Sequence, residues 1–394
     1  MSVGELQELD ARWVMPTYRR AAVEFVRGEG ARLWDVDGKR YLDFFAGLSV
    51  HNAGHCHPRI VAAIGDQAGR LMGASNLYYT EPGLRLARRI AESSIGGRVF
   101  LTNSGAEATE CAIKLVRQHA HGRGIERPEI VVLDGAFHGR TLAALAATPR
   151  LAREDLFGPL PEGFVAVQRD DADALRAAVG AKTAAVMVEP IQGEAGVWPI
   201  SSEVLAAARE ACDRAGALLV LDEIQTGMGR TGSLWAYEQL PVRPDVMTAA
   251  KALGGGLPVG ACVTAPQLGG VLGPGDHGST FAGGLVPAAA ALAAFDVIDD
   301  PALLRGVREL GGRFCDGLAA LGGVEGVRGR GLMIGAGLAD GLDAGEVAAA
   351  ALDAGLVINV PAPGTLRFLP PLVIGEAEVD EALEILGSAL EHQP

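Results

Sequence analysis

The segment LVLDEIQTGMGRTG (residues 219–232) decides the fold that we expect for this chain. It starts as an uninterrupted apolar run, delivers a carboxylate at Asp222 and then breaks into a glycine-rich turn. A strand that is apolar on both faces is typical of a parallel sheet covered by helices on both sides. The segment therefore predicts a central strand of an α/β domain with a polar group at its carboxyl end.

Six further apolar runs repeat this pattern, and helical patterns such as residues 171–179 and 202–215 separate most of them. The runs cover residues 98–103, 129–135, 164–168, 184–190, 245–250 and 259–265. We therefore predict an α/β fold whose large domain has a mainly parallel seven-stranded sheet covered by helices. Ligands gather at the carboxyl ends of such strands, which here carry Asn103-Ser104-Gly105, Glu189 and Asp222.

The pattern changes near residue 296, where short strands and helices replace the long strand–helix units. The expected helices cover residues 302–321, 343–354 and 376–391, and the expected strands cover 331–338, 355–360 and 365–369. We predict a smaller α+β domain at residues 296–394, to which an N-terminal segment at residues 1–50 contributes. The large domain then covers residues 51–295.

Composition and charge narrow the class of protein. The chain has 394 residues, is 49% hydrophobic and carries a net charge of −14 with a pI near 5.1. Without a block of Lys or Arg, nucleic acid and anionic membrane surfaces are not expected partners. The N-terminus has no signal pattern and no apolar run reaches membrane-spanning length. Five scattered cysteines, an odd number, predict reduced thiols in a cytoplasmic protein.

A metal site is not expected. His55-Cys56-His57 is the most suggestive cluster, but Pro58 follows it directly and no second ligand cluster accompanies it. We therefore assign this tripeptide a structural or turn role.

Lys251 differs from the other three lysines of the chain, Lys39, Lys114 and Lys182, which lie in ordinary polar or helical contexts. Lys251 lies in the run TAAKALGGG, where desolvation would lower the pKa of the amine and free its lone pair. Such a lysine forms Schiff bases, and an aspartate at a strand end can hold a pyridinium nitrogen. Judged on this stretch alone, a snorkelling surface lysine remains the alternative.

A phosphate site is indicated by NSGAEATECAIKLV (residues 103–116), directly after a strand. Ser104 and Glu107 have capping-box spacing, and an apolar helix face follows. Gly105 and Ala106 would then offer free backbone amides at a helix N-terminus, where phosphates bind. An ordinary capped helix is the alternative.

Two loops at strand ends carry side chains suited to binding. In AFHGRT (residues 136–141), Phe137 could stack on an aromatic ring and Arg140 could bind a carboxylate. In EPIQGEAG (residues 189–196), carboxylates lie where acid–base groups cluster. Solvated surface loops are the alternative for both.

Two later motifs could bind anions. HGSTFAGG (residues 277–284) offers hydroxyls and amides, with a flexible surface loop as the alternative. In TLRFLPP (residues 365–371), Arg367 sits in an apolar strand, which is costly unless the guanidinium has a partner. The alternative is an edge-strand arginine that reaches solvent. Two arginines in such settings suit a substrate with two carboxylates.

The GMGRTG turn (residues 227–232) matches the GxGxxG pattern of dinucleotide-binding proteins, but we reject that interpretation. Its glycines begin five positions after Asp222 instead of at the strand end. The following SLWAYEQLP is a poor crossover helix, and the next acidic candidate, Asp245, opens its strand instead of closing it.

Together and in this order, the motifs resemble those of the class III, ornithine/acetylornithine group of fold-type I aminotransferases, which use pyridoxal 5′-phosphate. The resemblance runs from about Tyr18 to Leu390, and it implies that residues 51–295 are the cofactor-binding domain. It also implies that Lys251 is the Schiff-base lysine and that Asp222 pairs with the pyridine nitrogen. These two are the expected catalytic residues.

The resemblance also implies the remaining site residues. The expected cofactor-binding residues are Ser104, Gly105, Ala106, Phe137, His138, Glu189, Asp222, Gln225, Lys251, Ser279 and Thr280. In such enzymes the residue at the Thr280 position comes from the other subunit, so a homodimer with shared active sites is expected. The expected substrate-binding residues are Tyr18, Leu48, Arg140, Glu194 and Arg367. By similarity, Arg367 binds the substrate α-carboxylate, Arg140 a second carboxylate, and Glu194 is a switch residue that pairs with Arg367.

The motifs resemble acetylornithine enzymes more than ornithine enzymes, in which Trp usually stands at the His138 position and Tyr at the Leu48 position. The implied reaction transfers the terminal amino group of N-acetylornithine to 2-oxoglutarate, in arginine biosynthesis, by a ping-pong cycle. The alternatives are a related ω-aminotransferase acting on ornithine, succinylornithine, 4-aminobutyrate or a carrier-linked lysine intermediate, an aminomutase, or a non-enzymatic binding protein. Two departures lie near the expected site: Gly283-Gly284-Leu285 replaces a usual Gly-Asn-Pro, and His51 replaces a common Val.

Overall fold

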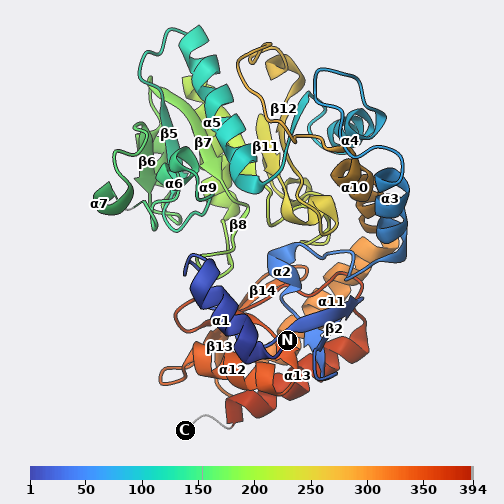
Figure 1. The fold of residues 1–394 in the computed structure, drawn as a ribbon. Coiled ribbons are helices and arrows are strands. Elements are labelled where there is room, and N and C mark those ends of the chain that lie inside the picture. The colour runs from blue at the N-terminus through green and yellow to red at the C-terminus, as the bar shows by residue number, and fades with distance from the viewer. Residues whose placement is uncertain (153, 392–394) are drawn as a thin grey trace.

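The centre of the larger body is a seven-stranded sheet, seen in a computed structural model that describes residues 1–152 and 154–391 (Figure 1). The strands lie in the order β4 (Val99–Thr102), β12 (Gly260–Thr264), β11 (Val246–Ala249), β10 (Leu218–Asp222), β7 (Thr183–Val188), β5 (Glu129–Leu133) and β6 (Phe164–Val167). All neighbours pair in parallel except β12, which is antiparallel to both β11 and β4. The predicted mainly parallel seven-stranded sheet is confirmed.

Both faces of this sheet are buried, which explains its uninterrupted apolar strands. Val131 and Leu133 pack with α8 (Ala172–Ala178) and α9 (Ser202–Ala215) on one face. Their neighbour Val132 points to the opposite face, which α5 (Gly105–Gly122) covers. Short helices α6 (Leu142–Ala146) and α7 (Glu154–Phe157) follow β5, and three helices, α3 (Pro58–Ala68), α4 (Glu81–Glu92) and α10 (Leu285–Ile298), pack together beyond β4.

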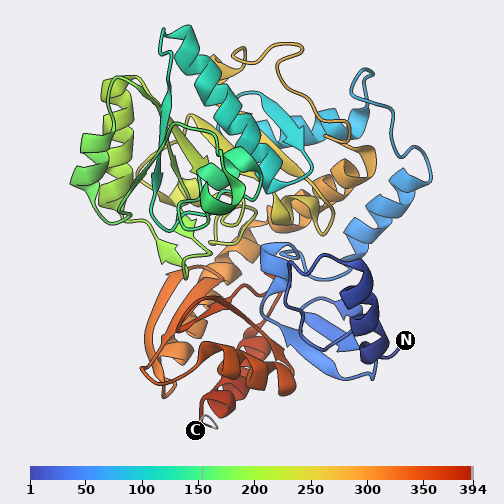
Figure 2. The same cartoon turned by 60° about the vertical axis from the view of Figure 1, so that its left-hand side comes forward.

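The N- and C-terminal parts of the chain meet in the smaller body, where blue and red segments lie side by side (Figure 2). One sheet joins β1 (Phe25–Glu29), β2 (Arg32–Asp35) and β3 (Arg40–Asp43) to β15 (Leu356–Val357). The other contains β13 (Val324–Arg330), β14 (Met333–Leu338), β17 (Thr365–Phe368) and β16 (Asn359–Ala362). The parallel pairing of β15 with β3 supports our proposal that residues 1–50 and 296–394 form one domain beside residues 51–295.

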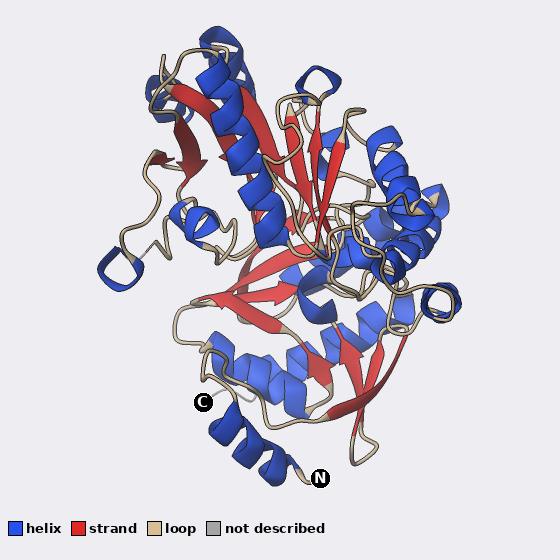
Figure 3. Cartoon of the chain, turned by 45° about the horizontal axis from the view of Figure 1, so that its top comes forward, coloured by secondary structure: helices blue, strands red, loops and turns tan. Residues whose placement is uncertain are grey.

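Helices α11 (Pro301–Ala319), α12 (Ala344–Asp353) and α13 (Glu376–Glu391) pack together in the smaller body, and α1 (Val3–Trp13) lies at its edge (Figure 3). The remaining short elements are α2 (Ala46–Ser49), the hairpin β8 (Ile191–Gln192) and β9 (Trp198–Pro199), and the 3₁₀ turns η1 (Ala236–Gln239), η2 (Lys251–Gly254) and η3 (Pro266–Leu268). In the described ranges, no helix combines the length and the apolar character needed to cross a bilayer.

The predicted capping box of α5 forms with a shifted partner. The Ser104 hydroxyl accepts a hydrogen bond from the Glu107 amide at 3.2 Å, as expected. The Glu107 carboxylate, however, accepts from the backbone amide of Asn103 at 2.7 Å, one residue before the N-cap. The helix start is therefore fixed from both sides, and the first-turn amides of Gly105 and Ala106 lie ahead of the helix's own hydrogen bonds.

Candidate active site

A cavity of about 450 Å³ opens at the carboxyl ends of the central strands. It collects residues from five of the motifs that the sequence singles out. Its lining includes Asn103, Ser104, Gly105, Ala106, Phe137, His138, Arg140, Glu189, Glu194, Asp222, Gln225 and Lys251. Groups that lie up to about 150 positions apart in the chain therefore face one space, as the topology of a doubly covered parallel sheet favours.

Lys251 begins η2, directly after β11, with a left-handed backbone at φ 51°. A non-glycine residue in this region is uncommon and costs conformational free energy, which is typical of functional positions. The side chain lines the cavity and keeps intermediate exposure. Burial lowers the pKa of the amine to about 8, with the nearby Arg367 also lowering it and Glu194, Asp222 and Glu189 opposing the shift.

The lowered pKa of Lys251 gives a pH prediction for the protein without cofactor. Only the neutral amine is nucleophilic, so its reactivity rises with pH through the pKa. Labelling of Lys251 by acetic anhydride, followed peptide by peptide by mass spectrometry, should reach half its maximal rate near the pKa of about 8. A midpoint near the ordinary lysine value of about 10.4 would contradict the desolvation that we infer.

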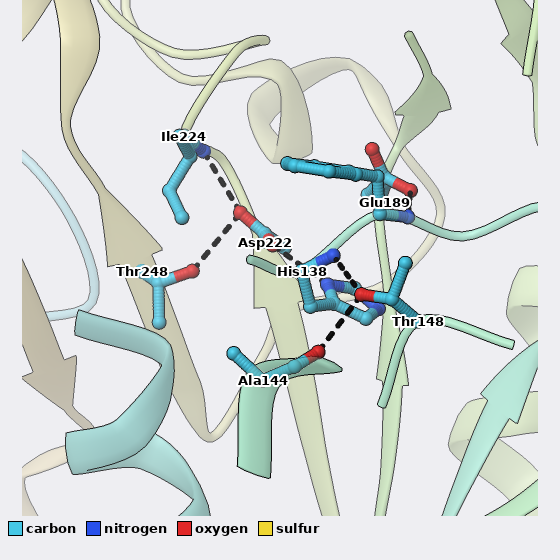
Figure 4. Close-up of polar contacts among 8 residues, drawn as sticks. His138, Ala144, Thr148, Glu189, Asp222, Ile224 and Thr248 are labelled. Carbon is cyan, nitrogen blue, oxygen red and sulfur yellow. Dashed lines mark hydrogen bonds and ion pairs between the residues drawn. The ribbon is translucent and has the colours of Figure 1, made fainter. Parts of the chain in front are cut away.

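Asp222 ends β10 as a buried carboxylate held from three directions (Figure 4). Its Oδ2 lies 2.7 Å from Nδ1 of His138. Its Oδ1 accepts hydrogen bonds from the Thr248 hydroxyl and the Ile224 amide, both at 3.1 Å. The carboxylate is thus fixed in orientation at the base of the cavity before any ligand arrives.

His138 is completely enclosed next to Asp222. Its amide donates to the Thr148 hydroxyl at 2.9 Å, and that hydroxyl donates to the Ala144 carbonyl at 2.8 Å (Figure 4). Burial alone would lower the pKa of the imidazole, but the hydrogen bond and charge of Asp222, together with Glu189, raise it. Nε2 of His138 is buried and lacks a hydrogen-bond partner among the described residues. His138 therefore contacts Asp222 through Nδ1 and leaves one polar atom unsatisfied beside the cavity.

Glu189 lies at the end of β7 on the other side of the cavity. One of its oxygens accepts a hydrogen bond from the Phe137 amide at 2.9 Å, which ties the AFHGRT loop to the EPIQGEAG loop. Burial raises the pKa of this carboxyl to about 8, an effect that Asp222 increases and His138 opposes. The raised pKa favours the neutral carboxyl, which can donate a hydrogen bond.

Arg367 is 1% exposed and has carboxylate and amide partners. Its Nη1 lies 2.6 Å from Glu194, and Nη2 and Nε donate to the Asn359 side chain at 2.6 and 3.1 Å. Burial would raise the pKa of Glu194, but the charge and hydrogen bond of Arg367 outweigh that effect and lower it. A more distant hydrogen bond of 3.4 Å reaches Gln225. The guanidinium is thus buried beside the cavity with one removable carboxylate partner.

Gly193, the first of the two glycines of EPIQGEAG, permits the close approach of this loop to Gln225. A Cβ on Gly193 would lie 1.9 Å from Oε1 of Gln225, so any larger residue would displace the Gln225 side chain. Gly105 is similarly enclosed, with Ile224 2.9 Å from the position of a Cβ.

Five predicted site residues do not line the cavity of the described chain: Arg367, which contacts the lining residues Glu194 and Gln225, and Tyr18, Leu48, Ser279 and Thr280. Tyr18 is 74% exposed, Thr280 is exposed, and Leu48 is half-buried. Ser279 accepts a hydrogen bond from the Asn103 side chain at 2.9 Å, so it contacts a cavity residue without lining the cavity. Arg140 does line the cavity but is exposed, with its guanidinium carbon 5.6 Å from the centre of the Phe137 ring.

Sequence reasoning missed Thr248 and Asn359. Thr248 is the register partner of Asp222 on β11, and only the strand order reveals that neighbour. Asn359 interrupts the apolar run VINV, and this polar residue opposite Arg367 in the β16–β17 pair is the signal that could have been used.

The GMGRTG turn binds protein groups. Arg230 is fully buried and donates to the carbonyls of Leu332 and Pro370 at 2.9 and 2.6 Å. Its sequence match to a dinucleotide motif therefore has a structural explanation. Among the described residues, no cluster of three or more His, Cys, Asp or Glu could hold a metal ion.

Comparison with known proteins gives one consistent family. Residues 14–390 match the family described as aminotransferase class-III. Acetylornithine aminotransferase of Caldanaerobacter subterraneus is 46% identical over 386 residues, which cover 97% of this chain and 98% of that protein. The ornithine aminotransferase structure from Toxoplasma gondii matches with a TM-score of 0.94 and 34% identity, covering 99% of this chain and 95% of that one.

A third relative is the N-acetylornithine aminotransferase structure from Stenotrophomonas maltophilia, with a TM-score of 0.83, 38% identity and 98% of each chain covered. The match spans both bodies and every motif that contributes to the cavity. The chain therefore belongs to the class-III aminotransferases, which are pyridoxal-phosphate-dependent transaminases.

Proposed function

We propose that this transaminase transfers the terminal amino group of N-acetylornithine to 2-oxoglutarate, as a step of arginine biosynthesis. The observation that carries the proposal is the pairing of the buried Arg367 with the half-buried Glu194 near Lys251. A guanidinium with a removable carboxylate partner suits two substrates in turn, of which 2-oxoglutarate brings one carboxylate more than N-acetylornithine. The 46% identity to a full-length protein named acetylornithine aminotransferase supports the same donor.

The residues of the cavity fit pyridoxal 5′-phosphate. The buried Asp222 carboxylate suits a pyridinium nitrogen, and the first-turn amides of α5 at Gly105 and Ala106, after the Ser104 cap, suit a phosphate. We assign Gln225 to the ring hydroxyl, Phe137 to stacking on the ring, and Lys251 to covalent attachment. His138, which lines the same cavity, adds a further polar atom, its Nε2, that has no hydrogen-bond partner among the described residues. When bound, pyridoxal 5′-phosphate supplies the electron sink for amino-group transfer.

The chain's own residues then orient the reactants and carry protons. Lys251, with its pKa lowered to about 8, can exist as the neutral amine near neutral pH and so take up a proton from the substrate carbon and return it. Asp222, held in place by its contact with His138, offers a carboxylate to the ring nitrogen, and a carboxylate there favours a protonated nitrogen. We assign Arg367 to the α-carboxylate of the substrate and the exposed Arg140 to a second carboxylate.

The variant Glu194→Gln tests whether Glu194 is a switch residue that pairs with Arg367. In Glu194→Gln the Arg367 guanidinium loses its charged partner but keeps a neutral one of the same shape. We expect KM for 2-oxoglutarate to fall relative to KM for N-acetylornithine by about tenfold, since a charged hydrogen bond contributes roughly 1.5–3 kcal/mol. Steady-state kinetics with both substrates measure the ratio. Arg150→Gln, which removes the hydrogen bond to the Glu194 carbonyl, is the matched control and should leave the ratio within about twofold. An unchanged ratio in Glu194→Gln would refute the switch.

A second copy of the chain would complete the site. Thr280 is exposed and does not line the cavity, and large apolar side chains nearby are also exposed. They are Leu77 at 87%, Tyr78 at 71%, Tyr79 at 96% and Phe281 at 77%. We propose that this surface forms a homodimer in the cytoplasm and that Ser279 and Thr280 contact the phosphate bound in the partner subunit.

Mixing two inactive variants tests the shared site. Lys251→Ala and Thr280→Ala should each be nearly inactive alone, Thr280→Ala when assayed at low cofactor concentration. Co-expressed under two affinity tags, the heterodimer should regain about a quarter to a half of wild-type activity per dimer, because one of its two sites contains neither substitution. Recovery of activity tests subunit sharing, and analytical ultracentrifugation gives the assembly state. A heterodimer as inactive as its parents would show that each subunit supplies its own Thr280.

A further inference from the structure

The turn α2 (Ala46–Ser49) has an unusual backbone. Four successive residues, three of them not glycine, have left-handed φ values of 46°, 59°, 67° and 67°. Such a run is costly for L-residues and persists only where surrounding contacts impose it. The turn lies between the two bodies (Figure 1), and Val50, directly after it, lines the cavity.

Arg230 supplies much of the contact that holds this turn. Its Nε donates to the Ser49 hydroxyl at 2.9 Å, and Nη2 donates to the Asn52 side chain at 2.5 Å. The Ser49 hydroxyl in turn donates to the same Asn52 oxygen at 3.0 Å. Asn52 closes the network by donating to the Met228 carbonyl, two residues before Arg230, at 2.8 Å.

The same guanidinium also contacts the smaller body. Its hydrogen bonds reach the carbonyls of Leu332, directly before β14, and of Pro370, two residues after β17, the strand that carries Arg367. The backbone of Leu332 returns a hydrogen bond to the Arg230 carbonyl at 3.1 Å. The described chain places no carboxylate in direct contact with Arg230; all its hydrogen-bond acceptors are hydroxyl, amide or carbonyl oxygens. Its geometry is therefore set by directional hydrogen bonds from three segments.

Two of these segments, and the loop of Arg230 itself, lie next to groups that we assign to the site. The turn carries Leu48 and precedes Val50, the segment after β17 follows Arg367, and Arg230 itself follows Asp222 and Gln225 on one continuous loop. We propose that Arg230 is a positioning residue that holds the left-handed turn at residues 46–49 against the cavity and thereby sets the affinity for the amino donor. The identity of that donor rests on the function proposed above, whereas the ordering of the turn does not.

Amide hydrogen exchange of the cofactor-free protein tests whether Arg230 orders the turn at residues 46–49. Arg230→Met keeps the length of the side chain and removes its donors. We expect the amides of residues 48–51 to exchange at least about tenfold faster, the size expected when charged hydrogen bonds are lost. Leu205→Ala is the control, because Leu205 is buried in α9 on the far side of the sheet. It should accelerate exchange in α9 and leave residues 48–51 unchanged.

Steady-state kinetics of the cofactor-loaded enzyme test whether the position of the turn sets the affinity for the amino donor. In Arg230→Met, KM for N-acetylornithine should rise about tenfold while kcat stays within about threefold, the signature of lost binding that is common to ground and transition states. Arg230→Lys should bring both the amide exchange rates of residues 48–51 and KM part of the way back to the wild-type values. If Arg230→Met does not fold, Ser49→Ala removes one acceptor and should change exchange and KM in the same direction by about threefold.

Unchanged exchange at residues 48–51 in Arg230→Met would overturn the inference, and so would a fall in kcat with KM unchanged. If wild-type protein does not use N-acetylornithine at all, the proposed donor is wrong, and the exchange measurement still decides whether Arg230 holds the turn.

Discussion

Replacing Lys251 with Ala is expected to lower kcat by roughly 10⁴-fold, the upper range for loss of a positioned acid–base group. Among the described residues that line the cavity, Lys251 is the single lysine, and its pKa of about 8 makes its amine available as a base. The same variant should lose covalent attachment of the cofactor. Borohydride reduction followed by peptide mass spectrometry measures the attachment, and a stopped-flow assay with saturating donor measures kcat.

Lys182→Ala is the matched control for this experiment. Lys182 precedes β7 at the opposite end of the strands and lines a separate surface pocket with Arg117 and Glu162. Its removal should leave both attachment and kcat unchanged. A Lys251→Ala protein that still carries reducible cofactor on another lysine would show that our assignment of the catalytic amine is wrong.

Asp222→Asn is expected to lower kcat by about 10²- to 10³-fold, the size found when one preorganised charge-stabilising group is removed. The amide keeps the shape of the buried carboxylate but not its charge, so it no longer stabilises a protonated ring nitrogen. It also leaves the His138 imidazole without its anionic partner, so the pKa of that imidazole should fall. Kinetics at saturating donor, together with NMR titration of His138, measure both effects.

Thr248→Val separates charge from hydrogen bonding at the same carboxylate. It removes the 3.1 Å hydrogen bond to Asp222 but keeps the negative charge, so kcat should fall by less than about tenfold. If Asp222→Asn instead retains kcat within about threefold of wild type, the carboxylate has no role in stabilising the transition state.

The strands of the large body could be predicted from sequence because they are buried on both faces and read as continuous apolar runs. All seven predicted strands are present in the sheet. Helix α10 was not predicted because its sequence LVPAAAALAAFDVI is apolar on every side, which leaves no helical periodicity to detect. The expected strand at residues 355–360 is in fact two, since β15 pairs with β3 and β16 with β17.

In the candidate site, too, some residues could be predicted from the sequence and others could not. Motif order and resemblance were enough to name Asp222, Lys251 and Arg367, because each stands in an apolar context that a charged side chain rarely occupies without a role. The contact between His138 and Asp222 could not be foreseen, because they lie 84 positions apart and only the order of the strands brings them together. The burial of Arg230 was equally hidden, because its partners are mostly backbone carbonyls and small polar side chains that no local motif announces.

The most direct test of the proposed function is the half-reaction of the purified, cofactor-loaded protein with single amino donors. We predict that N-acetylornithine converts the cofactor absorbance to that of the amine form faster than ornithine or 4-aminobutyrate at equal concentration, and that adding 2-oxoglutarate restores the original spectrum. If none of these donors changes the absorbance, or if the change with N-acetylornithine is the slowest of the three, the proposed donor is wrong.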